Sequence, residues 1–284
     1  MHGRGKPVFS FEFFPPKGDE GVGELLRTVA DLKDALAPNF VSVTNGAGGS
    51  TRARTLETVT RIQRDLGVTS MAHLTCVNVT EGDLCEEVGS LLGQGIENVL
   101  ALRGDPPKGE STFKPVQGGF AHASDLVQYL EDNYQVDIGA ACYPEKHVEA
   151  ASHDEDLKWT KLKVDHGALF LITQLFFDDQ EYFAFVERAR NARIRVPIVP
   201  GIMPITNVAQ VERFTKMCGA RIPAELAERL HRVKDDPAAV MATGIEHAIK
   251  QCRKLLEGGA PGLHFYTLNK SHATRSILAA VRKD

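Results

Sequence analysis

The acidic residue Glu12 lies in an aromatic run near the start of the chain, with the sequence Phe-Glu-Phe-Phe-Pro-Pro. Alternate side chains of a strand point to opposite faces, so Ser10, Glu12 and Phe14 are expected to share the inner face. Phe11 and Phe13 then face outward and suit packing under helices. A carboxylate among aromatic rings is poorly solvated, and burial is expected to raise its pKa, as a general acid near neutrality requires. A structural Glu paired with a basic residue is the alternative.

Two further polar groups follow apolar runs later in the chain. Gly104 permits close approach of a ligand to the backbone, and Asp105 follows it at the entrance of a loop. An ion pair between Arg103 and Asp105 within an ordinary turn is the structural alternative. Gln174 lies in an almost wholly apolar run, where a buried amide must find partners. It either satisfies a neighbouring group or binds a ligand that has donor and acceptor edges.

Polar residues recur at the ends of other strand-like runs. Thr44 ends the second run, His73 lies in the third, and the last run contains His264 and leads to Lys270. Each histidine taken alone is more often a satisfied core residue than a functional one. Their recurrence at successive strand ends therefore indicates a shared site.

A fifth run of small residues leads into an aromatic and a basic side chain, Tyr143 and His147. Small residues followed by an aromatic ring suit a flat aromatic ligand that lies against the strand. On the next predicted helix, Lys161 and Lys163 could neutralise phosphate groups, although a solvated helix face is the default for lysines. These residues favour binding of a cofactor with an aromatic ring and phosphates.

Apolar, β-branched or aromatic runs alternate with segments of helical periodicity along the 284 residues. Eight strand–helix repeats favour a parallel (β/α)8 TIM barrel, with a doubly wound sheet as the rival topology. Chemistry in such barrels takes place at the carboxyl ends of the strands, so the polar residues above are expected to gather at one mouth. The eight strand candidates are residues 8–14, 40–45, 70–77, 98–104, 137–143, 168–177, 196–203 and 262–268.

Two stretches depart from this alternation. Residues 105–124 form a long, polar segment rich in Gly and Pro, and such loops in compact domains are usually functional. Residues 207–259 are too many for one helix, and Pro223 and Pro237 divide them into about three. An extra helix is therefore expected before the last strand. No linker interrupts the pattern, so residues 1–284 are predicted to form a single barrel domain.

The composition argues against several classes of protein. A formal net charge of -4 does not suit a nucleic-acid or anionic membrane surface. The five cysteines are odd in number and form no CxxC pair, so neither a disulfide framework nor a metal site is expected. No leader or membrane-spanning run is apparent, and we expect a cytoplasmic protein. The absence of GxGxxG, Walker A, HExxH and GxSxG motifs argues against the enzyme classes that use them.

Eight short runs are distributed over nearly the whole chain. Several of them are too short to indicate a family individually, but together they are highly specific. They are SFEFFPP (10–16), FVSVT (40–44), HLTC (73–76), ALRGD (101–105), YPE (143–145), ITQ (172–174), PGI (200–202) and HFYTLN (264–269). In these runs and in their order, the chain resembles the methylenetetrahydrofolate reductase family, in its bacterial single-domain type. By this resemblance, no C-terminal regulatory domain of the eukaryotic kind is expected.

The resemblance implies a flavoprotein of one-carbon metabolism. Non-covalent FAD would take a hydride from NADH or NADPH and pass it to 5,10-methylenetetrahydrofolate in a ping-pong reaction, giving 5-methyltetrahydrofolate for methionine biosynthesis. The protein's task is then to position the flavin and to offer a proton donor. A folate substrate and a homo-oligomer are implied, with no nucleic-acid or membrane partner.

The resemblance also assigns roles to residues. Glu12 would be the general acid that opens the imidazolidine ring of the substrate, and Asp105 would act beside flavin and pterin. Substrate would bind to Gln174, Thr44 and Lys270. The flavin contacts of the family fall on Thr44, His73, Leu102, Arg103, Gly104, Asp105, Ala141, Tyr143, His147, Asp156 and Lys163.

The chain departs from the family pattern at three positions. Val208 stands where a family member has a Phe that stacks over the bound ligands, so nicotinamide and folate are held differently or the electron donor is another molecule. Trp159 and Leu162 replace polar residues that contact FAD. Two rival functions therefore stay open. One is a flavin-free barrel lyase or aldolase that uses Glu12 and Asp105, and the other is a flavin- or folate-binding subunit that needs an external electron donor.

Overall fold

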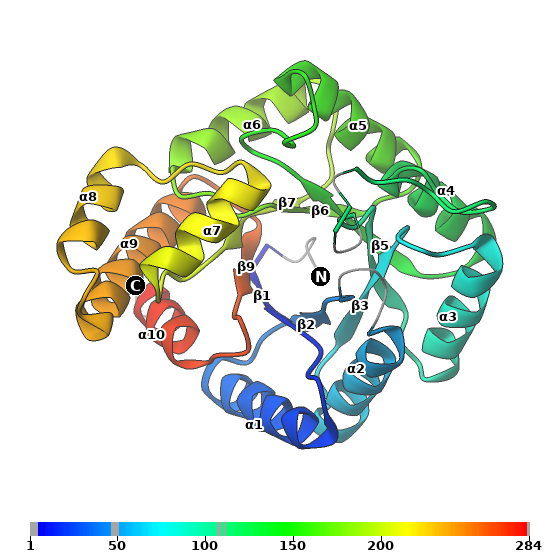
Figure 1. The fold of residues 1–284 in the computed structure, drawn as a ribbon, viewed down its shortest axis with the longest axis horizontal. Coiled ribbons are helices and arrows are strands. Elements are labelled where there is room, and N and C mark those ends of the chain that lie inside the picture. Colours follow the sequence, from blue (N-terminus) through cyan, green and yellow to red (C-terminus); the bar gives the residue numbers. More distant parts are fainter. Residues whose placement is uncertain (1–4, 47–50, 107–108, 111, 283–284) are drawn as a thin grey trace.

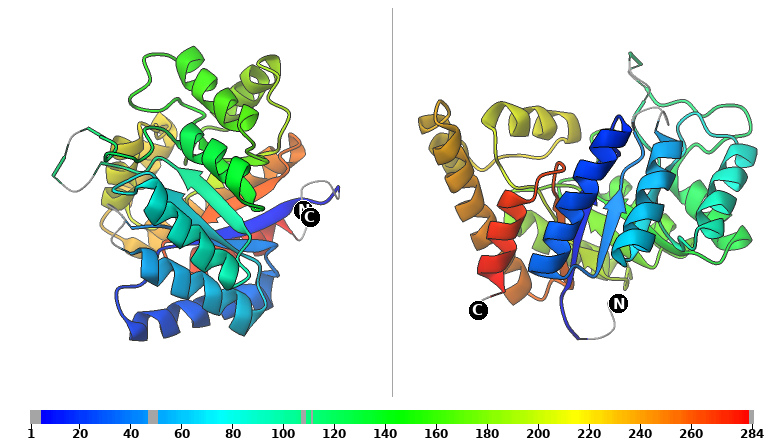
Figure 2. Two further views of the ribbon diagram at one scale, coloured as in Figure 1. Left: turned by 90° about the vertical axis from the view of Figure 1, so that its right-hand side faces the viewer. Right: turned by 90° about the horizontal axis from the view of Figure 1, so that it is seen from below.

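The computed structural model describes residues 5–46, 51–106, 109–110 and 112–282. Its helices form a ring around a central sheet, seen end-on in Figure 1 and from two sides in Figure 2. The strands are β1 (Val8–Phe13), β2 (Phe40–Val43), β3 (Ser70–Thr75), β4 (Asn98–Leu102), β5 (Asp137–Cys142), β6 (Phe170–Thr173), β7 (Ile198–Val199), β8 (Gly201–Ile202) and β9 (Gly262–Tyr266).

The sheet closes into a barrel through a seventh strand that is split in two. The strand order is β7-β6-β5-β4-β3-β2-β1-β9-β8, and every adjacent pair is parallel. Only Pro200 separates β7 from β8, and proline has no N–H to donate to a ladder. Since β7 pairs with β6 and β8 with β9, the two halves close the ring. The predicted TIM barrel is confirmed, and the doubly wound sheet is wrong because spatial order follows chain order.

Side-chain alternation divides the core into an interior and an outer layer. Phe11 and Phe13 are fully buried in the outer layer with the helices, as the alternation in β1 predicts. Phe14 does not join Ser10 and Glu12 on the inner face, because it lies beyond the end of β1 and is 45% exposed. The side chains that fill the barrel interior are Val8, Phe40, Met71, Leu100, Ile172 and Val199.

The helices alternate with the strands, as predicted. Residues 207–259 form α7, α8 and α9, so the extra helix before the last strand is confirmed (Figure 1). The helices of the described structure are α1 (Asp19–Leu36), α2 (Arg52–Leu66), α3 (Glu81–Gly93), α4 (Ala123–Asn133), α5 (His153–Asp165), α6 (Asp179–Asn191), α7 (Val208–Cys218), α8 (Ala224–Arg232), α9 (Pro237–Glu257) and α10 (His272–Val281). Among the described residues, none of these helices combines the length and apolar character needed to span a membrane.

The long polar segment between β4 and α4 is only partly described. Near its end, Gly119 forms an isolated antiparallel bridge with Thr80, which precedes α3. His122 precedes the first residue of α4, and its backbone N–H donates a hydrogen bond to the Asp125 carboxylate. The segment therefore joins the described structure on the same side as the loops that follow β3 and β4.

Candidate active site at the carboxyl ends of the strands

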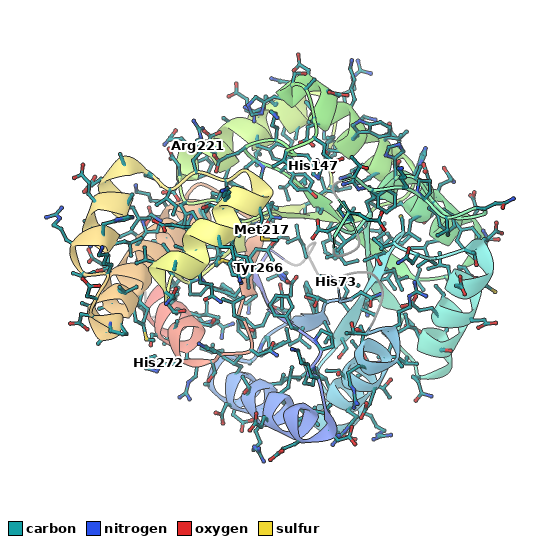
Figure 3. The ribbon with its side chains drawn as sticks, viewed as in Figure 1. His73, His147, Met217, Arg221, Tyr266 and His272 are labelled. Atoms are coloured by element: carbon teal, nitrogen blue, oxygen red, sulfur yellow. The ribbon has the colours of Figure 1, made fainter. Side chains whose placement is uncertain are left out.

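Glu12 lies between two imidazole rings inside the barrel. Its Oε2 is 3.4 Å from Nε2 of His73, on β3, and 3.4 Å from Nε2 of His264, on β9. All three side chains are almost enclosed, since His73 is 5% exposed, His264 is 0% and Glu12 is 12%. In Figure 3, His73 and Tyr266 lie toward the middle of the ring of helices, whereas His272 lies at its outside.

The hydroxyl group of Ser10 also belongs to this cluster. Ser10 Oγ is 2.8 Å from His264 Nδ1, and both residues are fully buried. If the serine hydroxyl donates to Nδ1, the proton of the neutral imidazole lies on Nε2 and is directed at Glu12. Ser10 and Glu12 are both on the inner face of β1, where the strand alternation placed them. The chain Ser10–His264–Glu12 can therefore hold and orient a proton.

The pKa of Glu12 is shifted in the direction opposite to the one predicted. Burial is the largest single effect and raises the pKa, as the aromatic run led us to expect. The hydrogen bond from His264 and the charges of His73 and His264 act against it and bring the pKa below its ordinary value. The sequence prediction was wrong because the imidazoles come from distant strands. Burial also lowers the pKa of His73, and the adjacent Glu12 carboxylate only partly compensates.

Above this cluster, several buried polar atoms have no hydrogen-bond partner in the described structure. They include the hydroxyl groups of Thr44 and Thr75 and both amide atoms of Asn45, at the ends of β2 and β3. Buried polar groups without partners are rare and call for a ligand or water. Because these atoms lie at the ends of two adjacent strands, on one part of the rim, they fit a ligand that offers both donors and acceptors.

A second group of predicted residues lies beyond β5 and on α5. The Tyr143 and His147 rings meet edge to face with centroids 4.8 Å apart, and Lys163 lies 5.9 Å from the centroid of Tyr143. Lys163 donates a hydrogen bond to the carbonyl of Ala141 and is almost buried, and burial lowers its pKa. Asp156 is also buried, and burial raises its pKa although Lys163 opposes the change. These five residues come together, as predicted.

Arg103 is held by a partner that the sequence did not suggest. Its guanidinium donates two hydrogen bonds to the Glu149 carboxylate, at 2.6 and 2.7 Å, and lies 5.1 Å from the centroid of the Phe113 ring. The predicted alternative of an Arg103–Asp105 pair is not what the structure forms, because Asp105 is exposed at the start of the long loop. Gly104 has a positive φ of 84°, which suits glycine.

The predicted substrate residues lie at separate points of the rim. Gln174 Oε1 accepts a hydrogen bond from the Leu175 N–H at 2.8 Å, which leaves its NH₂ group available to a ligand. Lys270 is exposed and borders a small pocket with Thr206 and Tyr266, and Thr44 lies at the end of β2. Leu102 lies at the end of β4, on the same rim.

The residues that depart from the family pattern are not all at the mouth. Val208 packs against the apolar cluster under α7 and α8 and does not project alone into solvent. Trp159 is 39% exposed and stacks on His122, with ring centroids 4.2 Å apart. Leu162 lies one turn further along α5 and is half-buried. Lys161 pairs with Asp165 on the outer face of α5, which is the default expected for a surface lysine.

Sequence reasoning placed His264 among the polar residues of a shared site without a specific role, and it assigned no site role to Ser10 or Glu149. For Ser10 and His264 a signal existed, since each alternates onto the inner face of its strand in register with the other. For Glu149 no local pattern was available, because it meets Arg103 across two loops that are 46 residues apart.

The fold and the mouth together are those of a TIM barrel with a polar cluster at the carboxyl ends of its strands. A family model described as "Methylenetetrahydrofolate reductase" matches residues 1–282. The chain belongs to this family. It is 44% identical over 285 residues to "Probable methylenetetrahydrofolate reductase (NADH)" of Oryza sativa subsp. japonica, covering 96% of this chain and 48% of the relative.

Two other curated relatives give the same result. "Methylenetetrahydrofolate reductase (NADH) 1" of Arabidopsis thaliana is 43% identical, with 97% of this chain and 48% of the relative covered. The chain thus spans about half the length of these plant relatives. "5,10-methylenetetrahydrofolate reductase" of Escherichia coli K12 is 38% identical over 274 residues, covering 96% of this chain and 90% of the relative.

A solved structure is similar in fold. An uncharacterised protein from Clostridium thermocellum, described as binding two copies of 5-methyl-5,6,7,8-tetrahydrofolic acid, aligns with a TM-score of 0.62. The alignment covers 99% of this chain and 96% of that protein at 15% sequence identity. At this identity the similarity concerns the barrel fold alone.

Proposed function

We propose that this chain is a flavin-dependent reductase that converts 5,10-methylenetetrahydrofolate to 5-methyltetrahydrofolate, with FAD and a reduced nicotinamide nucleotide. The observation that carries the proposal is the Glu12 carboxylate, set between His73 and His264 near unpaired buried polar groups at the ends of β2 and β3. Membership of the family supports the reaction. The names of the plant relatives specify NADH, and NADH is the reductant that we propose.

The residues at the mouth fit FAD. The unpartnered atoms of Thr44 and Asn45 can bind polar edges of the flavin ring, and Arg103 and Lys163 are the basic side chains that we propose for the phosphates. The bound flavin would supply the hydride chemistry. The full set of residues that we propose for the cofactor is Thr44, His73, Leu102, Arg103, Gly104, Asp105, Ala141, Tyr143, His147, Asp156 and Lys163.

Glu12 would deliver the proton that opens the imidazolidine ring of the substrate. The lowered pKa of the carboxyl belongs to the open mouth, where His264 and His73 stabilise the carboxylate. Bound ligands would exclude water from the mouth, and further desolvation favours the protonated carboxyl. Asp105, after β4, and Gln174, after β6, would bind the pterin, and Lys270 would bind a more distant part of the folate.

The variant Glu12→Gln tests this function. The amide preserves the shape and part of the hydrogen bonding but cannot donate an acidic proton. We expect FAD to bind and to be reduced by NADH at close to the normal rate, while oxidation by methylenetetrahydrofolate slows by about 10² to 10⁴ fold. Stopped-flow absorbance of the flavin measures the two half-reactions separately.

The matched control is Glu24→Gln on the exposed face of α1, which should leave both half-reactions unchanged. If Glu12→Gln slows both half-reactions equally, Glu12 is a structural residue and the assignment as acid fails. A purified protein that is colourless and does not take up FAD would contradict the whole proposal and favour the flavin-free lyase.

An electron-accepting subunit is the second candidate function, favoured by Val208. Val208 is aliphatic and packs against the cluster under α7 and α8, so this position has no aromatic ring that could stack on a nicotinamide. In that case the flavin would bind but would not bleach on rapid mixing with NADH or NADPH, and an external donor would be required. Homo-oligomeric assembly stays a prediction of the family resemblance, which sedimentation velocity can check.

A further inference from the structure

The loop that follows β9 has an unusual backbone. Leu268 and Asn269 both have positive φ angles, 51° and 59°, in the left-handed region that non-glycine residues seldom adopt. Two such residues in succession are energetically costly, and such conformations persist only where surrounding contacts hold them. The contacts that hold this loop are made by Thr267 and Asn269, and both are directed at β1.

These two side chains hold the backbone of β1 on either side of Phe13. The Thr267 hydroxyl donates a hydrogen bond to the carbonyl of Glu12 at 2.6 Å, and the Thr267 N–H lies 3.3 Å from the same oxygen. The Asn269 amide makes two hydrogen bonds to Phe14, accepting from its N–H at 2.8 Å and donating to its carbonyl at 2.9 Å. The end of β1 is therefore tied to the loop after β9.

These hydrogen bonds bear on the position of the Glu12 carboxylate. Glu12 is the second-last residue of β1, and its partner His264 lies on β9, two residues before Tyr266, which is opposite Glu12 in the register. The contact between the carboxylate and His264 Nε2 is already long at 3.4 Å. Strand ends open locally more easily than strand centres, so a small shift of β1 against β9 would break this contact.

We infer that Thr267 and Asn269 are positioning residues, which hold the end of β1 so that the Glu12 carboxylate stays against His264 and His73. The inference rests on the proposed function for its kinetic consequence only. Neither side chain needs to contact substrate or flavin. Instead, both act through the backbone of Glu12 and Phe14, and the left-handed turn at Leu268 and Asn269 is the conformation that directs the amide back at β1.

Two variants remove these hydrogen bonds, and Thr267→Val also removes the one that the Thr267 hydroxyl accepts from the Asn269 N–H at 3.2 Å. Thr267→Val is isosteric and lacks the hydroxyl. Asn269→Gly removes the amide and, as glycine, tolerates the positive φ. We expect oxidation of reduced flavin by methylenetetrahydrofolate to slow by about tenfold to a hundredfold in each, as for a catalytic group displaced by about an ångström. Reduction of the flavin by NADH should be unchanged, and Thr267→Ser should restore the folate half-reaction.

A second measurement needs no cofactor. The carboxyl carbon of Glu12 can be followed by ¹³C NMR as a function of pH in the ligand-free protein. When the contact with His264 is loosened while the site stays buried, the pKa of Glu12 should move upward in both variants and return in Thr267→Ser. Thr28→Val, which removes a hydroxyl bonded within α1, is the matched control and should not move it.

Three outcomes would overturn the inference. An unchanged titration of Glu12 in both folded variants would mean that the hydrogen bonds from Thr267 and Asn269 do not position the carboxylate. Equal slowing of both half-reactions, or a lower melting temperature with normal kinetics, would assign the loop a structural role alone. The Glu12→Gln result separates this failure from failure of the proposed function. If one variant does not fold, the other carries the test, because each removes a different bond to β1.

Discussion

The chemistry of Glu12 is set by residues that are far from it in the chain. His264 is 252 positions away, yet its ring lies 3.4 Å from the carboxylate, and Ser10 bonds to the far side of that ring. Burial inside the barrel alone would raise the pKa of Glu12. The imidazoles reverse the direction, so the ligand-free carboxyl is ionised more readily than an ordinary glutamate.

Trp159 offers a direct report on cofactor binding. It is the single tryptophan of the chain, it is partly exposed, and it stacks on His122. It lies on α5 between Asp156 and Lys163, at the helical spacing that places the three on neighbouring positions of one side. We therefore expect saturable quenching of the tryptophan fluorescence when FAD is added to the apoprotein, because the flavin would lie near the indole.

The control for this prediction is the Trp159→Phe variant, which should bind FAD but give no signal. Free tryptophan mixed with the same FAD concentrations corrects for absorbance by the flavin. A titration that follows the free-tryptophan curve, in a protein shown to retain FAD on gel filtration, would place the cofactor away from α5.

At the scale of elements, α2 and α3 are joined by a partly buried ion pair. Arg52 Nε lies 3.6 Å from Glu87 Oε2, and the Arg52 guanidinium also donates to the carbonyls of Val77 and Asn78. Burial raises the pKa of Glu87 to about 7, although Arg52 opposes the shift. The pair thus connects the start of α2 to the middle of α3 and, through Arg52, to the loop after β3.

This pKa predicts how stability depends on pH. A folded pKa above the ordinary value means that Glu87 favours the native state while protonated and loses this contribution as pH rises from about 4.5 to about 7. Glu87→Gln removes the ionisation. The difference in free energy of unfolding between the variant and the wild type should therefore change by roughly 2 kcal/mol, in favour of the variant, as pH rises from about 5 to about 8. Urea denaturation at the two pH values measures this.

The neighbouring Glu86 is exposed on the same helix, and Glu86→Gln should show no comparable dependence on pH. A Glu87→Gln variant whose stability runs parallel to the wild type at both pH values would mean that Glu87 ionises as an ordinary surface carboxyl does.

At the scale of the whole molecule, closure of the barrel depends on tight strand contacts. A Cβ added to Gly262, at the start of β9, would lie 1.9 Å from the carbonyl oxygen of Val8 on β1. One added to Gly201, on β8, would lie 2.4 Å from the Thr173 carbonyl oxygen. In a closed barrel each strand pairs on both sides, so the backbone at either glycine cannot shift without moving the neighbouring strands.

We therefore expect Gly262→Ala to lower the free energy of unfolding by about 3 kcal/mol or more, because β1 and β9 must separate to admit the methyl group. Since Glu12 and His264 lie on those two strands, FAD-dependent turnover should fall as well. Gly23→Ala is the control, because a Cβ there meets nothing within 4 Å and alanine favours the helix. Equal denaturation curves for the two variants would mean that the closure can relax.

Much of the architecture followed from local patterns. Strand alternation placed Phe11 and Phe13 outward and Ser10 inward, and the prolines at 223 and 237 divided residues 207–259 as the structure does. Local periodicity was less reliable for orientation in α9. There the buried face is formed by Val240, Gly244, Ala248, Gln251, Cys252 and Leu255, so glycine, alanine and glutamine belong to it beside the large apolar residues. Small residues lie where α9 packs closely, and a hydrophobic pattern does not reveal this.

The sequence by itself determined the barrel, the extra helix and the set of polar residues at the strand ends, because periodicity and breaker residues act over a few positions. Only the tertiary structure decided which of those residues meet. It paired Arg103 with Glu149 and not with Asp105, and it set Glu12 against two imidazoles that reverse the expected shift of its pKa. Electrostatic effects depend on distance in space, and the closing of the barrel brings together groups that no local pattern relates.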